Sequence, residues 1–176
     1  MKRFLITTAD ERTWPKDRPV LFLGEWCKLY ARRHIWSRMD AEVVPYHWDD
    51  RNKFYRDHCY LRDLHERMLA EVANRLNEIH EAKHSLRYWR ILIGPWLGFF
   101  IQMLFDRWEM IHEAVETHQI SATRIADNGL DRQVPNDMVD FQRHYLADSL
   151  SDGNSPERTS ATYAENAAMV ALPSSA

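Results

Sequence analysis

Four consecutive residues, Asp10, Glu11, Arg12 and Thr13, combine side chains that can do chemistry. They follow residues 4–8, an apolar and β-branched run that predicts a short strand. In open α/β sheets, ligands bind beyond the carboxyl ends of the strands. A carboxylate there can act as a general base, a guanidinium can bind an anion, and a hydroxyl can bind a sugar. We therefore predict Asp10 and Glu11 as catalytic residues and Arg12 and Thr13 as substrate-binding residues, the alternative being that Asp10 and Arg12 only close a tight loop.

A second group follows another expected strand, residues 41–46. His47 can exchange a proton near neutral pH, with Asp49 orienting the ring. We predict His47 as a catalytic residue and Asp49 as a substrate-binding residue, whereas Asp50 is favoured as a charge at the positive end of a helix. Metal binding by His47, Asp49 and His58 stays open, but their spacing does not argue for it, so no metal site is predicted.

His80, Glu81 and His84 match H-E-x-x-H, in which two histidines on one helical face bind zinc and the glutamate acts as base. The match falls at the expected end of a helix, beside a break and next to Lys83. A solvated helix end is therefore favoured, and a zinc metalloprotease is only a distant third function.

The most apolar and aromatic stretch of the chain is residues 84–108. Its uncharged run, residues 91–105, is shorter than the about 20 residues that span a bilayer, so no membrane span is predicted. We expect a buried core helix that Pro95 kinks or interrupts. Arg87 and Arg90 would line a pocket at its start, as substrate-binding residues. The alternative is a helix lying on an anionic membrane surface.

The elements that must position these residues follow from apolar patterns. Short β-forming runs predict strands, and nearly continuous apolar character favours a parallel sheet covered on both faces. Apolar residues three and four apart predict long helices, capped by Asp49 and by Ser85. The expected strands are 4–8, 20–23, 41–46 and 120–125, and the expected helices are 26–36, 49–79, 85–116 and one starting at 136 or 137 and ending at 144. This order predicts the α/β class.

Composition sets further limits. The formal net charge of −3 does not favour a nucleic-acid partner. Two distant cysteines and a polar N-terminal stretch favour the cytoplasm. No glycine-rich turn follows the first expected strand, so no dinucleotide or other cofactor is predicted. Residues 151–176 are rich in Ser, Ala and Thr and are expected to be a disordered tail, leaving residues 1–150 as one folded domain.

Several blocks of the sequence resemble the N-terminal part of a bacterial transferase family associated with O-antigen and other surface-polysaccharide biosynthesis. The resemblance covers about residues 4–150, and its blocks are residues 4–15, 20–27, 40–51, 84–111 and 134–138. Members are longer and look like two-domain glycosyltransferases of the GT-B kind. The resemblance implies that residues 1–150 form the Rossmann-like, acceptor-side domain of such an enzyme.

The resemblance also implies partners for the complete enzyme: a nucleotide-sugar donor and a glycan or lipid-linked acceptor. Arg12 and Arg87 would contact a phosphate of the donor or of the acceptor. The chain is expected to be truncated and inactive alone, with the donor-binding domain encoded separately. It would be cytoplasmic, with peripheral contact at the inner face of the membrane. The alternative is a non-catalytic fragment or a membrane-peripheral binding module that uses residues 84–108.

Overall fold

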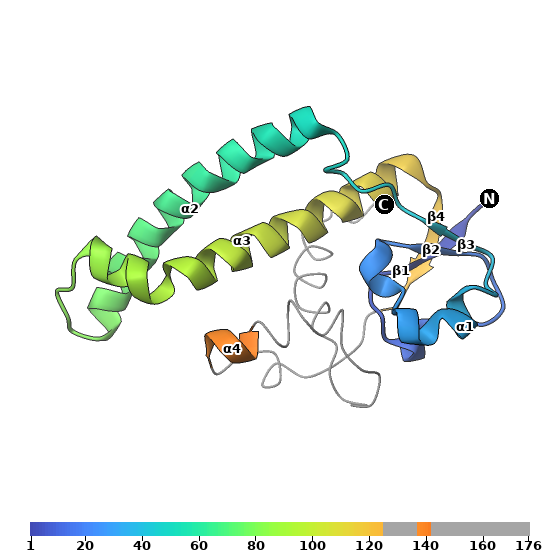
Figure 1. The fold of residues 1–176 in the computed structure, drawn as a ribbon, viewed down its shortest axis with the longest axis horizontal. Helices are drawn as coiled ribbons and strands as arrows, with labels where there is room; N and C mark the ends of the chain where they lie inside the picture. The colour runs from blue at the N-terminus through green and yellow to red at the C-terminus, as the bar shows by residue number, and fades with distance from the viewer. Residues whose placement is uncertain (125–136, 142–176) are drawn as a thin grey trace. The chain divides into compact units, whose positions relative to one another are not determined.

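The computed structural model describes residues 1–124 and 137–141 (Figure 1). Two compact units divide the chain. The first contains residues 1–46 and 107–124 with residues 137–141, and the second is His47–Asp106. The expected tail, residues 151–176, lies outside the described residues. Of the last expected helix, the described part is α4, Met138–Phe141, where Asp137 Oδ1 accepts a hydrogen bond from Asp140 N at 2.8 Å.

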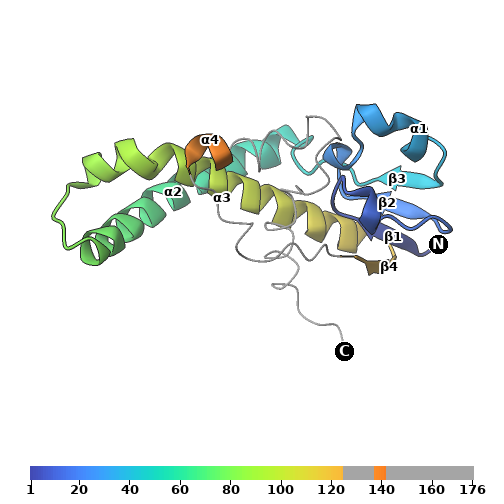
Figure 2. The same cartoon turned by 90° about the horizontal axis from the view of Figure 1, so that it is seen from below.

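A four-stranded parallel sheet forms the centre of the first unit, and its strands lie side by side in Figures 1 and 2. The strands follow the order β3-β2-β1-β4, as in a Rossmann-like sheet, so the expected α/β class and parallel pairing are confirmed. Their bounds are β1 Arg3–Ile6, β2 Val20–Phe22, β3 Ala41–Val43 and β4 Ile120–Thr123.

The core of the first unit is built on β2. Val20, Leu21 and Phe22 are all fully buried. Successive strand residues point to opposite faces, so both faces of the sheet are covered at β2. Met110 and Ile111, from the last turns of the long helix α3, Leu86–Thr117, pack into the same core. Burying a side chain of this size contributes about 1.5–3 kcal/mol, so these contacts stabilise the edge that carries the predicted site.

Short turns connect the first three strands. The β1–β2 connection contains only the 3-10 turn η1, Glu11–Thr13. The expected helix 26–36 is three shorter pieces, η2 Glu25–Cys27, η3 Tyr30–Arg32 and α1 Arg33–Trp36. Both cysteines of the chain are free thiols.

Two long helices make up most of the second unit. Helix α2, Arg51–Ile79, begins after Asp50, whose Oδ1 accepts a hydrogen bond from Asn52 N at 2.8 Å. Asp50, not the expected Asp49, is therefore its N-cap. Helix α3, Leu86–Thr117, starts in the second unit and ends in the first. Ser85 caps it as expected, accepting a hydrogen bond from Tyr88 N at 3.3 Å.

Pro95 lies inside α3 without interrupting it. Contacts with α2 hold the helix together on one side, where Leu97 and Ile101 pack against Leu61 and Leu69. The expected interruption near residues 91–95 is therefore absent, and the alternative, a kink, stays a prediction.

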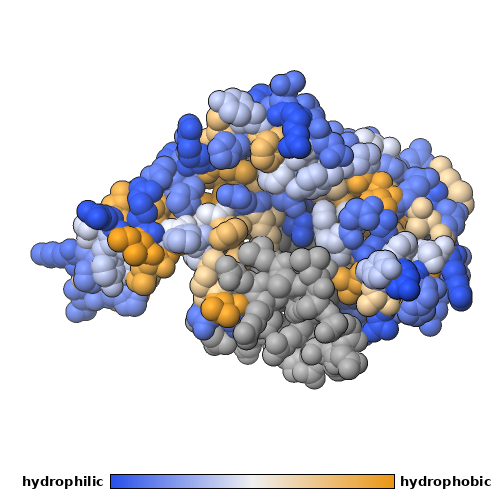
Figure 3. Space-filling model, in the orientation of Figure 1, coloured by the Kyte–Doolittle hydropathy of each residue, from blue (hydrophilic) through white to orange (hydrophobic). Residues whose placement is uncertain are grey.

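The expectation of a buried helix at residues 84–108 is wrong for much of its length. Ile91 is 72% exposed, Leu92 60% and Phe99 45%, and only 22% of the most apolar 18-residue window of α3 is buried. Apolar surface accordingly interrupts the hydrophilic surface at the tip of the α2–α3 hairpin (Figure 3). Within the second unit α3 packs against one helix, which cannot cover its whole circumference. Among the described residues, α3 is long and apolar enough to cross a membrane, judged by length and composition alone.

The H-E-x-x-H match does not lie on a helix. Helix α2 ends at Ile79, His80 is its C-cap, and Glu81 has a positive φ of 50°. His84 lies in the loop before α3. The two histidines therefore do not share a helical face, and the geometry of a zinc metalloprotease is absent.

Candidate functional site

The carboxyl edge of the parallel sheet carries the first group of predicted residues. Strands β2 and β3 lie on one side of β1 and β4 on the other, so the chain reverses its direction of winding between β1 and β4. Such a topological switch point is where open α/β sheets bind ligands. The loop after β1, residues 7–14, and Arg124, directly after β4, meet there. We call this place the switch-point edge.

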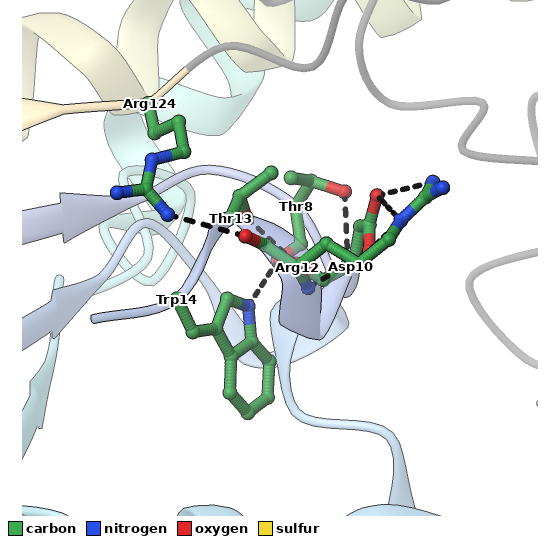
Figure 4. A network of polar contacts seen from close by, with 6 residues as sticks. All are labelled: Thr8, Asp10, Arg12, Thr13, Trp14 and Arg124. Atoms are coloured by element: carbon green, nitrogen blue, oxygen red, sulfur yellow. Dashed lines mark hydrogen bonds and ion pairs between the residues drawn. The ribbon is translucent and has the colours of Figure 1, made fainter. Parts of the chain in front are cut away.

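A dense polar network holds the loop after β1 (Figure 4). Asp10 caps η1, accepting a hydrogen bond from Arg12 N at 3.0 Å, and its carboxylate binds the Arg12 guanidinium through both oxygens. Thr13 Oγ1 donates to Asp10 O at 2.7 Å, and Trp14 Nε1 donates to Thr8 O at 2.9 Å. The loop is therefore rigidly built, and the Thr13 hydroxyl is already engaged inside it.

Asp10 is a poor proton acceptor in this state. Burial raises the pKa of Asp10, but the hydrogen bonds and charge of Arg12 outweigh burial and hold the pKa below its ordinary value. The Arg12 side chain is 64% exposed while Asp10 is 10% exposed. The pair thus presents a guanidinium outward, with its counter-charge behind it.

Glu11 is placed differently from Asp10. Its Oε1 lies 3.1 Å from Arg32 Nε, in an ion pair whose geometry is not that of a hydrogen bond. Oε1 is buried and has no hydrogen-bond partner in the described part of the chain. A buried acceptor without a hydrogen bond is costly and is typical of functional sites. Of the two carboxylates in this loop, Glu11 therefore has fewer hydrogen bonds to the described residues than Asp10.

Sequence reasoning missed two arginines at this edge. Arg124 Nη1 donates to Arg12 O at 3.2 Å, which joins β4 to the loop after β1. Arg107, on α3, lies with its Cζ 3.7 Å from the centroid of the Trp26 ring, in the loop after β2. Arg124 lies near the carboxyl end of the expected strand 120–125, which was a usable signal. The stacking of Arg107 on Trp26 joins residues 81 positions apart and leaves no local pattern.

The second group of predicted residues lies in the second unit. His47 is buried, its Nε2 is 3.1 Å from Asp106 Oδ1, and its Nδ1 is 3.2 Å from Lys53 Nζ. An ammonium can only donate, so these contacts suit a neutral imidazole that accepts at Nδ1 and donates from Nε2. Asp106 and Lys53 orient the ring in place of the expected Asp49, which makes no hydrogen bond among the described residues.

Asp57 completes this cluster. Its Oδ2 accepts hydrogen bonds from Lys53 Nζ at 2.6 Å and from Trp48 Nε1 at 3.0 Å. Burial raises the pKa of Asp57, but these hydrogen bonds and the Lys53 charge outweigh burial and lower it. Both ring nitrogens of His47 already have partners, so removing a substrate proton would first require Lys53 to leave Nδ1. The same contacts leave His47, Asp49 and His58 without a shared set of free metal ligands.

Arg87 and Arg90 follow the start of α3 but differ in their contacts. Arg90 binds both carboxylate oxygens of Glu66, at 2.5 and 2.6 Å. Arg87 is exposed and makes no ion pair in the described residues. The eight predicted site residues are thus divided between the units: Asp10 to Thr13 lie in the first, and His47, Asp49, Arg87 and Arg90 in the second, where His47 contacts Asp106 and Arg90 contacts Glu66.

The switch-point edge offers guanidinium groups, a carboxylate oxygen without a hydrogen bond and a rigid loop, a set that suits a polar ligand with hydroxyl or phosphate groups. The family model of the LIC12162 family transferase matches residues 3–153, which is most of the chain and includes both groups of predicted residues. No curated protein and no solved structure matches the chain.

Proposed function

The chain belongs to the LIC12162 family of transferases, and we propose that its first unit binds the acceptor of a glycosyl transfer reaction. The observation that carries this proposal is the polar, rigid loop after β1 at the switch point of a parallel sheet. Transferases join a donor and an acceptor, and this edge is the place where such a sheet binds ligands. Its exposed groups can bind the hydroxyls of a sugar.

Glu11 is our candidate for the general base. In the proposed reaction it takes the proton from an acceptor hydroxyl, whose oxygen then bonds to the anomeric carbon of the donor sugar as the nucleoside diphosphate leaves. Asp10 is less suited, because Arg12 occupies both of its oxygens. His47 is less suited, because both of its ring nitrogens have partners. Arg12 would bind an acceptor hydroxyl or phosphate.

More specifically, we propose that the transferase acts in surface-polysaccharide or O-antigen biosynthesis. The donor would be a nucleotide sugar held by a GT-B-type second domain, and the acceptor a glycan or a lipid-linked glycan. This places the protein in the cytoplasm, where nucleotide sugars are available. The sequence similarity of the five blocks described above supports this role.

Calorimetric titration with short oligosaccharides of rhamnose, mannose and N-acetylglucosamine tests acceptor binding. We expect at least one to bind the full chain, and Arg12→Ala to weaken its binding about tenfold because a charge-assisted hydrogen bond is lost. Arg18→Ala is the matched control, since Arg18 is 53% exposed and outside the polar network. Equal losses of sugar affinity in Arg12→Ala and Arg18→Ala would contradict the proposal. So would a wild-type protein that binds no sugar but binds acyl-coenzyme A tightly.

The exposed apolar side chains of α3 favour a second function, peripheral binding to an anionic membrane. Leu86, Ile91 and Leu92 are 42%, 72% and 60% exposed, and Lys83 and Arg87 lie nearby in sequence. Apolar residues beside cations are typical of helices that lie in the headgroup layer. Flotation with vesicles containing phosphatidylglycerol should then carry wild-type protein but not Ile91→Glu, and equal flotation of both would rule this function out.

A further inference from the structure

A groove of about 520 Å³ lies between α2 and α3, entirely within the second unit. This volume is in the range of small-molecule sites. One face of each helix lines it, at successive positions one, three or four apart. The lining residues are Trp48, Phe54, His58, Leu61, Arg62, His65, Arg90, Gly94, Pro95, Gly98, Phe99 and Gln102. Neither the family assignment nor the switch-point edge accounts for this groove.

Two glycines hollow the α3 side of the groove. Gly94 and Gly98 are one turn apart and present no side chain to it. A Cβ added at Gly94 would lie 3.5 Å from Arg90 Cγ, and one at Gly98 would lie 3.8 Å from the His65 ring, both ordinary contacts. Helix packing therefore does not require glycine at either position, although glycine weakens a helix. The helix is less stable than it could be, and the groove stays open beside the His65 ring, whose Nε2 lies 3.0 Å from Gly94 O.

The groove has apolar walls and basic ionisable groups. Its four ionisable lining residues are His58, Arg62, His65 and Arg90, and no carboxylate lines it. Arg90 is neutralised by Glu66. Arg62 forms an ion pair with Asp63 through Nε, at 3.1 Å, and its two Nη groups make no hydrogen bond in the described residues. An anionic group therefore meets free donors at Arg62.

We propose that this groove binds a single-chain anionic amphiphile, with its apolar chain over Gly94 and Gly98 and its phosphate head at Arg62 and His58. Phe54, Leu61 and Phe99 would cover the chain. A nucleotide such as ATP fits less well, because Gln102 is the one lining residue with an amide, the side chain that pairs with an adenine edge. This site is separate from the switch-point edge and does not depend on the proposed glycosyl transfer.

Calorimetric titration of the full chain with decyl phosphate, below its micelle concentration, tests the proposal. Decanol, inorganic phosphate and ATP are the comparison probes. We expect decyl phosphate to bind at one site, and decanol and inorganic phosphate each to bind about tenfold more weakly or worse, because each lacks half of the recognised chemistry. Tighter binding of ATP or of inorganic phosphate would overturn the proposal, as would no saturable binding of decyl phosphate.

Variants locate the binding. Gly98→Leu should weaken decyl phosphate binding about tenfold or more by filling the groove, whereas the matched Gly98→Ala should change it less than about threefold. Arg62→Ala, at an exposed position that leaves the fold intact, should weaken binding about tenfold by removing the head contact. Circular dichroism checks that Gly98→Leu is folded. Wild-type affinity in Arg62→Ala, or in folded Gly98→Leu, would place the amphiphile elsewhere and overturn the proposal.

Discussion

At the residue scale, the pairing of Asp10 with Arg12 decides how the loop after β1 can act. The Asp10 carboxylate accepts hydrogen bonds from the Arg12 guanidinium through both oxygens and from Arg12 N, so its charge is already paired within the protein. Glu11, one residue later, has a buried oxygen without a hydrogen bond. Two neighbouring carboxylates thus have different surroundings: Asp10 fixes the loop, and Glu11, in an ion pair with Arg32, keeps one oxygen without a hydrogen bond.

Removing the charge of Asp10 should make stability less dependent on pH. Its pKa is lowered in the folded protein, so its stabilisation is present above the unfolded pKa and is lost as the pH falls through the folded pKa. Asp10→Asn keeps a capping side chain and should lower the free energy of unfolding by about 0.5 kcal/mol at pH 7, because Arg12 is exposed to solvent. This loss should shrink as the pH falls below the ordinary aspartate pKa of about 3.9.

Urea unfolding at pH 7 and at low pH measures this difference. Asp17→Asn is the matched control, since Asp17 is 77% exposed and its ion pair with Arg18 is long, at 3.5 Å. A difference between wild type and Asp10→Asn that grew as the pH fell would show that Arg12 does not stabilise the ionised carboxylate.

Gly24 is a second residue whose type the structure explains. A Cβ at this position would lie 2.1–2.4 Å from three atoms of the Trp26 ring, so the ring and the Arg107 stacked on it would have to move. Gly24→Ala should destabilise the protein by about 1–3 kcal/mol, the usual cost of overpacking. Gly94→Ala is the control, because its Cβ meets no atom closer than 3.5 Å and it should gain about 0.5–1 kcal/mol. Thermal unfolding of both variants checks the sign.

At the element scale, two adjacent aspartates at the start of α2 have different roles. Asp50 accepts from Asn52 N, while Asp49 makes no hydrogen bond in the described residues. Asp50→Ala should therefore cost about 1 kcal/mol of stability, and Asp49→Ala should cost much less. Chemical denaturation of the two variants measures the difference, and equal losses would show that Asp50 is not the N-cap.

Helix α3 is the element that sequence reasoning described least well. Its start, its cap and its end near residue 116 follow from local signals that the structure confirms. Its burial does not follow from them, because an apolar helix is buried only where partners from elsewhere in the chain cover it. Leu97 has such a partner in α2, and Ile91 has none among the described residues. Composition alone therefore could not distinguish the buried part from the exposed part.

At the scale of the whole molecule, the sheet was predictable and the surroundings of the site were not. Consecutive apolar, β-forming residues such as those of β2 identify a buried parallel strand from local sequence. The partners of His47 could not be found in this way, since Asp106 lies 59 residues away. The hydrophobic periodicity of the sequence also could not show that His47–Asp106 form a separate compact unit, because the helices of this unit have the same apolar spacing as other helices. The prediction of one domain over residues 1–150 stays a prediction.

The most direct test of the account is the rate of sugar transfer from nucleotide sugars to glycan acceptors by the complete two-domain enzyme, in which the first unit is wild type or carries Glu11→Gln or Glu25→Gln. UDP-, GDP- and dTDP-sugars serve as donors, and release of nucleoside diphosphate is followed. We expect acceptor-dependent release that Glu11→Gln slows about 10²–10⁴-fold, the usual contribution of a general base. Glu25, in the neighbouring loop and 78% exposed, should be dispensable. Equal rates in wild type and Glu11→Gln, or transfer only of an acyl group from acyl-coenzyme A, would contradict the account.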